Sequence, residues 1–253
     1  MKLRQPRTKV EKRGYLADTI ALCHPKMFFV IFCVLTIGHF MAPGRVDLGR
    51  WALTTFGVLI AVLSAYRLNE LHDRTTATSI PRSHHKALAG LFIAIAVTIA
   101  IILALFYVWW ILILALIGTG LIVLYNLDVH PLLHNKPVYA LTWGTLPLVF
   151  SEMAQSGNLI PTIPTLLMGI WAGLLAVYTL WLWGPMTCGR MSVCSRAKGK
   201  PIKRLCHSPV LRCRDRVVMP REVHEHMKAL IDLNIFSVML ITLTIVWLKM
   251  VGL

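Results

Sequence analysis

The stretch from Ala87 to Asn126 constrains the fold more than any other, because its 40 residues include no Asp, Glu, Lys or Arg. A single helix of this length would be ~60 Å long, about twice the thickness of a bilayer's hydrocarbon core. The stretch therefore predicts two apolar helices joined by a turn. We expect the turn near Tyr107, Trp109 and Trp110, since aromatic side chains of this kind suit a membrane–water interface.

The rest of the chain repeats this apolar character. Hydrophobic residues make up 57% of the sequence, and its mean hydropathy of +0.67 is far from that of a soluble globular protein. We predict an all-α integral membrane protein with about seven transmembrane helices. The apolar segments are 27–42, 51–68, 87–106, 108–126, 138–152, 162–184 and 230–251. The fifth is short and contains both a glycine and a proline.

The basic residues predict the orientation of these segments. If the N-terminus is cytoplasmic, only three of the 26 Lys and Arg residues, namely Arg45, Arg50 and Lys249, fall on the opposite side. This distribution follows the positive-inside rule and predicts a protein of the cytoplasmic (inner) membrane. The net charge of +15 is explained by topology and by contact with anionic membrane lipids, so no nucleic acid partner is needed.

The segments and the charges together divide the chain into four parts. We expect a basic cytoplasmic arm over 1–26 and a bundle of about six spans over 27–184. A basic, Cys- and His-rich cytoplasmic loop is expected over 185–228, and a final transmembrane helix over 229–253.

A polar hexapeptide, Asn69-Glu70-Leu71-His72-Asp73-Arg74, follows the second apolar segment. Asn69 and Asp73 are four residues apart and so share one face of a helix. Ionisable groups at the edge of a membrane are costly to bury and often belong to functional sites. The hexapeptide by itself fits both a ligand site and an ordinary solvated helix end.

Longer stretches around this motif resemble the UbiA superfamily of membrane prenyltransferases. Ser64–Arg74 is similar to the first Asp-rich motif of that superfamily, and Ile80–Ser83 to the basic continuation of the motif. Tyr125–Leu127, Asn135 and Ala140–Pro147 are similar to its fourth-to-fifth helix region. The resemblance covers roughly residues 20–185. It implies a helical bundle that transfers an isoprenyl group from its diphosphate to an acceptor.

The resemblance also implies a magnesium–diphosphate site. Carboxylates hold Mg²⁺, which takes up the negative charge of the leaving diphosphate, and Arg and Lys side chains complete the clamp. Asn69 and Asp73 would be the catalytic metal ligands, with Glu70 as a further carboxylate. The residues expected to contact the diphosphate are Arg74, Arg82 and Lys86.

The chain departs from the superfamily pattern at several positions. Ala77 stands at the third position of the first motif, and 184–198, where the second Asp-rich motif should lie, contains no carboxylate. Losing one charge-stabilising group typically costs ~10²- to 10³-fold in rate. We therefore expect prenyl transfer to be lost or weakened.

Four cysteines fall within the predicted cytoplasmic loop: Cys188, Cys194, Cys206 and Cys213. Cytosolic thiols normally stay reduced, so such a cluster is a candidate for a zinc or iron–sulfur site. However, the cysteines are separated by 5, 11 and 6 residues, without a Cys-x-x-Cys pair. Small buried thiols packed against the bundle are the alternative.

Three functions remain open from the sequence. The first is a UbiA-like protein that binds an isoprenoid, a quinone or a lipid in its apolar cavity and acts as a subunit or assembly factor of a membrane complex. The second is an active prenyltransferase that keeps one Mg²⁺ and uses the Cys-rich loop for replacement contacts. The third is a metal or redox protein built on the cytoplasmic cysteines.

Overall fold

The computed structural model describes residues 25–73, 80–126, 136–195 and 221–252, with backbone alone at 70, 72–73, 180–195 and 221–224. Within these ranges the chain is helical and contains no strand. The predicted all-α class is therefore confirmed for the described part of the protein.

The helices follow the predicted apolar segments closely. The break within the long uncharged stretch falls between Phe106 and Ile111, where the sequence predicts it. The elements are α2 (Pro25–Met41), α3 (Leu48–Asp73), α4 (Arg82–Phe106), α5 (Ile111–Asn126), α6 (Lys136–Ala140), η1 (Leu141–Thr145), α7 (Leu146–Ser156), α8 (Ile163–Ser195) and α9 (Arg221–Met250).

Three stretches of the described helices are long and apolar enough to cross a membrane: Leu48–Asn69, Arg82–Phe106 and Glu225–Met250. Three shorter apolar stretches, of 10 to 17 residues, accompany them: Pro25–Met41, Ile111–Asn126 and Ile163–Thr179. These lengths and compositions support a membrane protein.

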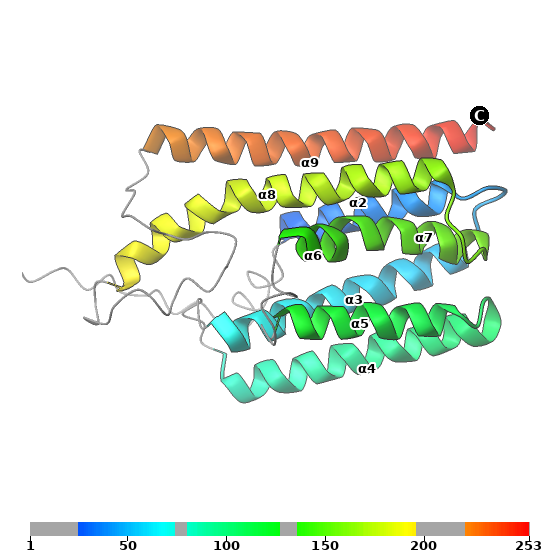
Figure 1. Cartoon of the computed structure of the whole chain (residues 1–253), viewed down its shortest axis with the longest axis horizontal. Helices are drawn as coiled ribbons and strands as arrows, with labels where there is room; N and C mark the ends of the chain where they lie inside the picture. Colours follow the sequence, from blue (N-terminus) through cyan, green and yellow to red (C-terminus); the bar gives the residue numbers. More distant parts are fainter. Residues whose placement is uncertain (1–24, 74–79, 127–135, 196–220, 253) are drawn as a thin grey trace, which may run out of the picture.

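The long helices run side by side along one axis, so their connections gather at two ends (Figure 1). We call the end that contains Asp73, Arg82 and Asn126 the motif end. The other, which contains the α4–α5 turn and Ser156, is the turn end. Because each long helix has one terminus at each end, residues far apart in the sequence meet at both ends.

Helices α6 and α7 are joined through η1, a wider π-helical turn, into one continuous helix that packs against α2 and α8 (Figure 1). Two glycines allow these contacts. A Cβ atom on Gly38 would lie 2.2 Å from the carbonyl oxygen of Leu148. A Cβ atom on Gly144 would lie 2.3 Å from the carbonyl oxygen of Ala172. Such close backbone approach through small residues is typical of membrane helix pairs.

The widened turn also has its own polar link to α8. The Thr145 hydroxyl donates to the carbonyl oxygen of Gly169 at 2.9 Å. A Cβ atom on Gly173 would meet this hydroxyl at 2.6 Å, so α8 presents glycine where the two helices touch. Single π turns inside longer helices often occur at functional sites.

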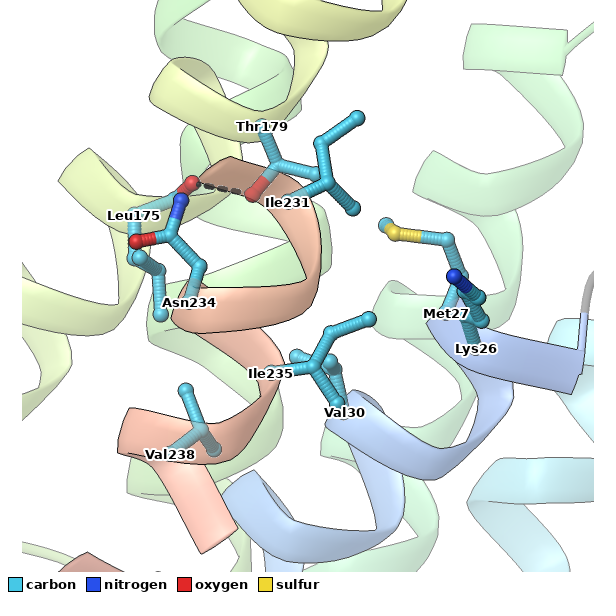
Figure 2. A pocket seen from close by; sticks show the side chains of 9 residues that line it. All are labelled: Lys26, Met27, Val30, Leu175, Thr179, Ile231, Asn234, Ile235 and Val238. Atoms are coloured by element: carbon cyan, nitrogen blue, oxygen red, sulfur yellow. Dashed lines mark hydrogen bonds between the residues drawn. The ribbon is translucent and has the colours of Figure 1, made fainter. Parts of the chain in front are cut away.

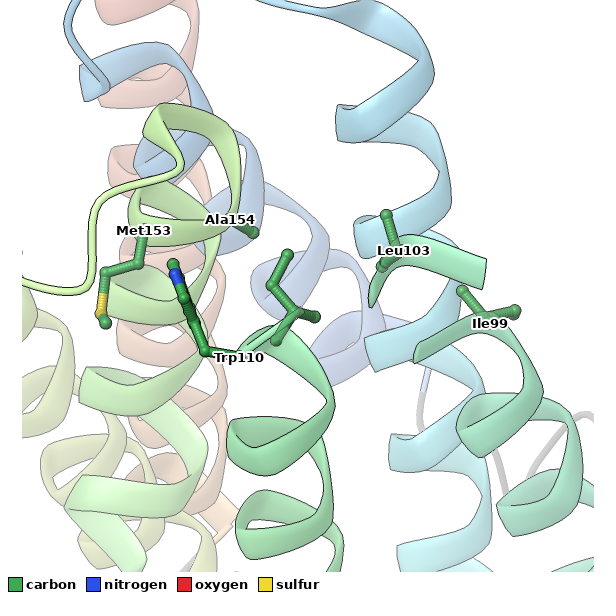
Figure 3. Close-up of a cluster of buried hydrophobic side chains, with 6 residues drawn as sticks. Ile99, Leu103, Trp110, Met153 and Ala154 are labelled. Atoms are coloured by element: carbon green, nitrogen blue, oxygen red, sulfur yellow. The ribbon is translucent and has the colours of Figure 1, made fainter. Parts of the chain in front are cut away.

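Apolar side chains fill the spaces between the helices in three clusters. Figure 3 shows the cluster at the turn end, where Ile99, Leu103 and Trp110 meet Met153 and Ala154. The other two lie around α2. One joins α2 to α3 and comprises Ile31, Leu35, Leu59 and Val62. The other joins α2 to α7 and α8 and comprises Val34, Ile37, Leu148 and Ala172.

The structure differs from the expected boundaries of the cytoplasmic loop. Helix α8 continues to Ser195, and α9 begins at Arg221, whereas the sequence suggests a loop over 185–228. The hydropathy of the sequence shows where the apolar side chains of a helix end. The backbone hydrogen bonds of the helix can continue through the polar residues that follow. Cys188 and Cys194 therefore lie on helical backbone.

We predict that Gly144→Ala lowers the free energy of unfolding by about 1–3 kcal/mol, because the added methyl group overpacks a backbone contact. Thermal unfolding in detergent measures the effect. Gly118→Ala on α5 is the matched control, since no described atom lies within 4 Å of its added methyl group. The control should keep or slightly raise stability, because alanine favours helix. Equal transition temperatures for the two variants would contradict the predicted contact.

Candidate functional site

Arg67 is the most unusual side chain at the motif end. It lies on α3, six residues before Asp73, and only 2% of it is exposed. Its Nη1 atom has no hydrogen-bond partner among the described residues. Burying a guanidinium without all of its hydrogen bonds costs free energy of folding. Such a group is therefore a candidate for binding an anionic ligand.

Two further helices place buried polar side chains at the same end. His85, in the first turn of α4, is 4% exposed, and the guanidinium of Arg67 lies within electrostatic reach of its ring. Asn126, the last residue of α5, is also 4% exposed, and its amide donates to the carbonyl oxygen of Ile122 at 2.7 Å. We call Arg67, His85 and Asn126 the buried polar set.

A row of stacked aromatic rings lies beside this set. Tyr66 stacks on Trp143 at 5.6 Å between ring centroids, and Trp143 stacks on Tyr139 at 5.8 Å. Tyr139 then meets Tyr125 at 6.0 Å with tilted planes. These four residues, the aromatic ladder, join α3, η1, α6 and α5 in an arrangement that aromatic pairs prefer.

The ladder brings together three of the stretches on which the superfamily resemblance depends, namely Ser64–Arg74, Tyr125–Leu127 and Ala140–Pro147. Tyr66 belongs to the first stretch, Tyr125 to the second and Trp143 to the third. Tyr66 also precedes Arg67 directly, so the ladder begins one residue from the buried guanidinium. The ladder therefore brings a row of aromatic rings next to a buried cation.

The predicted magnesium ligands lie on the last turns of α3. Asn69 is half-buried there. The side chains of Glu70 and Asp73 lie outside the described part of the structure, as does all of Arg74. The magnesium site therefore remains a prediction.

The other two predicted diphosphate contacts open α4, and both are exposed. Arg82 donates from Nη2 to the carbonyl oxygen of Leu71 at 2.8 Å. It thus satisfies a carbonyl group near the C-terminal end of α3, where a cation is also favoured by the helix dipole. Lys86 lies one turn further along α4.

The predicted cysteine site cannot be assembled from the described side chains. Cys188 and Cys194 are described by backbone only, and Cys206 and Cys213 fall in the range 196–220, outside the description. Among the described residues, no group of three or more His, Cys, Asp or Glu side chains could hold a metal ion. Zinc and iron–sulfur binding remain predictions.

An apolar groove lies between α2, α8 and α9 (Figure 2). Its polar members are Lys26, Thr179 and Asn234, and the Lys26 ammonium forms an ion pair with Asp232 across α2 and α9. The Asn234 amide nitrogen is buried and has no hydrogen-bond partner in the described structure. The space enclosed in the groove is about 10 Å³, which is room for about one water molecule and far below the volume of a typical ligand pocket.

The buried guanidinium at the motif end was not predicted from the sequence. In the distribution of basic residues Arg67 is one of the 23 expected on the cytoplasmic side, but the structure places the residue inside α3 and buries it. The available signal was its position within segment 51–68, because a lone cation in an apolar helix often marks a functional site.

Comparisons with protein-family models, with curated proteins and with solved structures gave no match to this chain. The inference of function therefore depends on its side chains alone.

We predict that Arg67→Met keeps or raises the thermal stability of the protein, since it removes a buried charge whose hydrogen bonds are incomplete. Arg50→Met is the matched control. Arg50 donates from Nη1 to the carbonyl oxygens of Ala154 and Gln155 and lies 4.6 Å from the centre of the Tyr107 ring. Losing these contacts should cost about 1.5–3 kcal/mol. A larger loss for Arg67→Met than for Arg50→Met in thermal unfolding would show that Arg67 is a structural residue.

Proposed function

We propose that this chain is a membrane helical bundle that binds an isoprenoid or related lipid with an anionic head group at its motif end. The observation that carries the proposal is Arg67, a buried guanidinium whose Nη1 lacks a described partner. Guanidinium groups match phosphate oxygens in geometry and charge. A phosphate or diphosphate head would supply an acceptor for Nη1 and a negative charge beside the guanidinium.

The aromatic ladder supports a lipid-like tail on this head group. Its rings form an apolar row from Tyr66, next to Arg67, through Trp143 to Tyr125. A quinone is a weaker fit, because its neutral carbonyl oxygens would leave the guanidinium charge uncompensated. Asn69 and Asp73 follow Arg67 by two and six residues in the sequence, and they remain the predicted ligands of a magnesium ion that would accompany a diphosphate.

Prenyl transfer is lost or weakened in this proposal. The chain lacks a carboxylate at position 77 and throughout 184–198, so a second metal site cannot form from the residues that the superfamily uses. With fewer charges to stabilise the leaving diphosphate, ionisation of the substrate slows. The bundle then serves to hold its ligand, as a subunit or assembly factor of a membrane complex.

The edge formed by α9 supports the role of a subunit. In the described part of the chain, α9 packs mainly on α2 and α8, and it leaves a row of large apolar side chains exposed. The row comprises Leu233, Phe236, Leu240, Leu243 and Trp247. These side chains offer a surface to bilayer lipids or to apolar helices of another membrane protein.

Our proposal also includes seven membrane-crossing segments with a cytoplasmic N-terminus. The turn end would then face away from the cytoplasm. Two of its three cations are held by carbonyl oxygens, as Arg50 donates to Gln155 and Lys249 donates to Ala42 at 2.6 Å. In this orientation the turn end lies on the side of the membrane that has few basic residues. The Arg50 and Lys249 side chains found there have structural partners within the bundle.

Farnesyl diphosphate should bind the purified protein in detergent more tightly than farnesol, which has the same tail without the charge. Arg67→Met should weaken binding of the diphosphate by about 10- to 100-fold, the effect of losing a charged hydrogen bond. Arg45→Met is the control, because this arginine is exposed at the turn end. Equal affinities for the alcohol and the diphosphate would contradict the proposed head-group site.

Release of diphosphate with Mg²⁺ and an acceptor present tests the catalytic part of the proposal. We expect slow or undetectable turnover in wild-type protein. Fast turnover that Asp73→Asn abolishes would identify an active prenyltransferase and would overturn weakened catalysis, while leaving the binding site in place.

Cysteine labelling tests the orientation. Ser83→Cys at the motif end and Asn158→Cys at the turn end both introduce thiols at exposed positions. In intact cells a membrane-impermeant maleimide should label Asn158→Cys above the wild-type background, and Ser83→Cys only after permeabilisation. The reverse pattern would place the N-terminus outside.

A further inference from the structure

A second set of buried polar side chains lies at the turn end, far from the buried polar set. His39 on α2 and Glu152 on α7 are both 0% exposed, and Gln155 on α7 is 6% exposed. Several of their polar atoms lack a hydrogen-bond partner among the described residues: Nε2 of His39 and both carboxyl oxygens of Glu152. Glu152 is the last residue of the predicted apolar segment 138–152, so its complete burial is unexpected.

Gln155 determines which nitrogen of His39 carries the proton. In the orientation that satisfies both ends of its amide, the oxygen accepts from the backbone N–H of Asp47. Its nitrogen then donates to the carbonyl oxygen of Asp47 at 3.2 Å and to Nδ1 of His39 at 3.1 Å. Nδ1 is thus an acceptor, and the neutral ring carries its proton on Nε2.

No cation in the described structure neutralises Glu152. The backbone N–H of Thr162 lies near its carboxyl group and favours the ionised form, but it carries no formal positive charge. The nearby cations are used elsewhere, since Arg50 on α3 donates to the carbonyl oxygens that end α7 and Lys249 on α9 donates to Ala42.

The helices packed against α7 bring few other titratable groups to this end. His39 comes from α2, and Asp47 precedes α3. Within its described side chains, α8 has Tyr178 alone, close to the motif end, and α5 has Tyr125 alone, also at that end. An ionised carboxylate at Glu152 would therefore be both desolvated and unpaired, which is the most costly state for a buried acid.

We propose that His39, Glu152 and Gln155 form a proton-binding site, in which the Glu152 carboxylate takes up one proton from water and becomes a neutral carboxylic acid. Uptake cancels the unpaired charge without a metal ion or a salt bridge. The exposed residue Asp47, whose backbone holds Gln155, connects the site to the surface at the turn end. The site is independent of any ligand at Arg67.

Proton uptake at Glu152 would be linked to the packing of α7 between α2 and α8. The folded protein would hold a proton that an unfolded, solvated glutamate releases at neutral pH. Stability must then fall as the pH rises through the titration of this site, because the native state binds more protons than the unfolded state. Loss of the proton would weaken the packing of α7 at the turn end. It would not act directly on the residues of the motif end.

Infrared spectroscopy of the purified protein in lipid nanodiscs tests the proposal. At neutral pH the wild-type spectrum should contain the C=O stretching band of a protonated carboxylic acid, which shifts in D₂O and lies apart from carboxylate bands. Glu152→Gln, which resembles the neutral acid in shape, should remove the band and flatten the dependence of thermal stability on pH. Glu225→Gln is the control, because Glu225 is exposed on α9, and it should change neither readout.

Absence of the band from the wild-type spectrum at neutral pH would overturn the proposal, and this measurement needs no variant. Persistence of the band in folded Glu152→Gln would also overturn it. If Glu152→Gln does not fold, Glu152→Asp should retain the band at a shifted frequency, and an unshifted band would assign the proton to another group.

Discussion

The contacts of backbone on backbone at Gly38 and Gly144 are the constraint on which the rest of the structure depends. In an apolar surrounding there is no hydrophobic drive to bring helices together, so their association needs close packing. These two glycines hold the α6–η1–α7 helix against α2 on one side and α8 on the other. One helix therefore places Trp143 in the aromatic ladder and Glu152 at the turn end.

Each end of the bundle contains a buried ionisable group, the Arg67 guanidinium at the motif end and the Glu152 carboxyl group at the turn end. The two groups are too far apart to form an ion pair. Arg67 lies 19 residues from the start of α3, which corresponds to about 28 Å along the helix. Over such a distance, attraction to an ionised Glu152 would contribute only about 0.6 kcal/mol at an effective dielectric constant near 20. Each end must therefore be neutralised locally: by an anionic ligand at Arg67 in our proposal, and by a proton at Glu152.

Much of the fold could be predicted, because apolar length and charge-free stretches are local properties. The break within Ala87–Asn126 and the positions of the apolar helices follow from them. Burial of Arg67 and Glu152 could not be predicted in the same way, since it depends on which faces of α3 and α7 meet other helices. Helix α3 is apolar over most of its surface, so its sequence does not show which side is covered. The continuation of α8 to Ser195 was missed because polar residues can extend a helix beyond its apolar surface.

The π turn at Leu141–Thr145 sets the rotational phase between the two halves of one helix. Each residue of an α-helix turns the following side chains by about 100°. Removing one residue from this turn would restore regular α-helix but rotate α7 relative to α6. Either Tyr139 and Trp143 would leave the aromatic ladder, or Gln155 would turn away from His39. The number of residues in the turn, and not their identity alone, thus keeps the chemistry of the two ends in register.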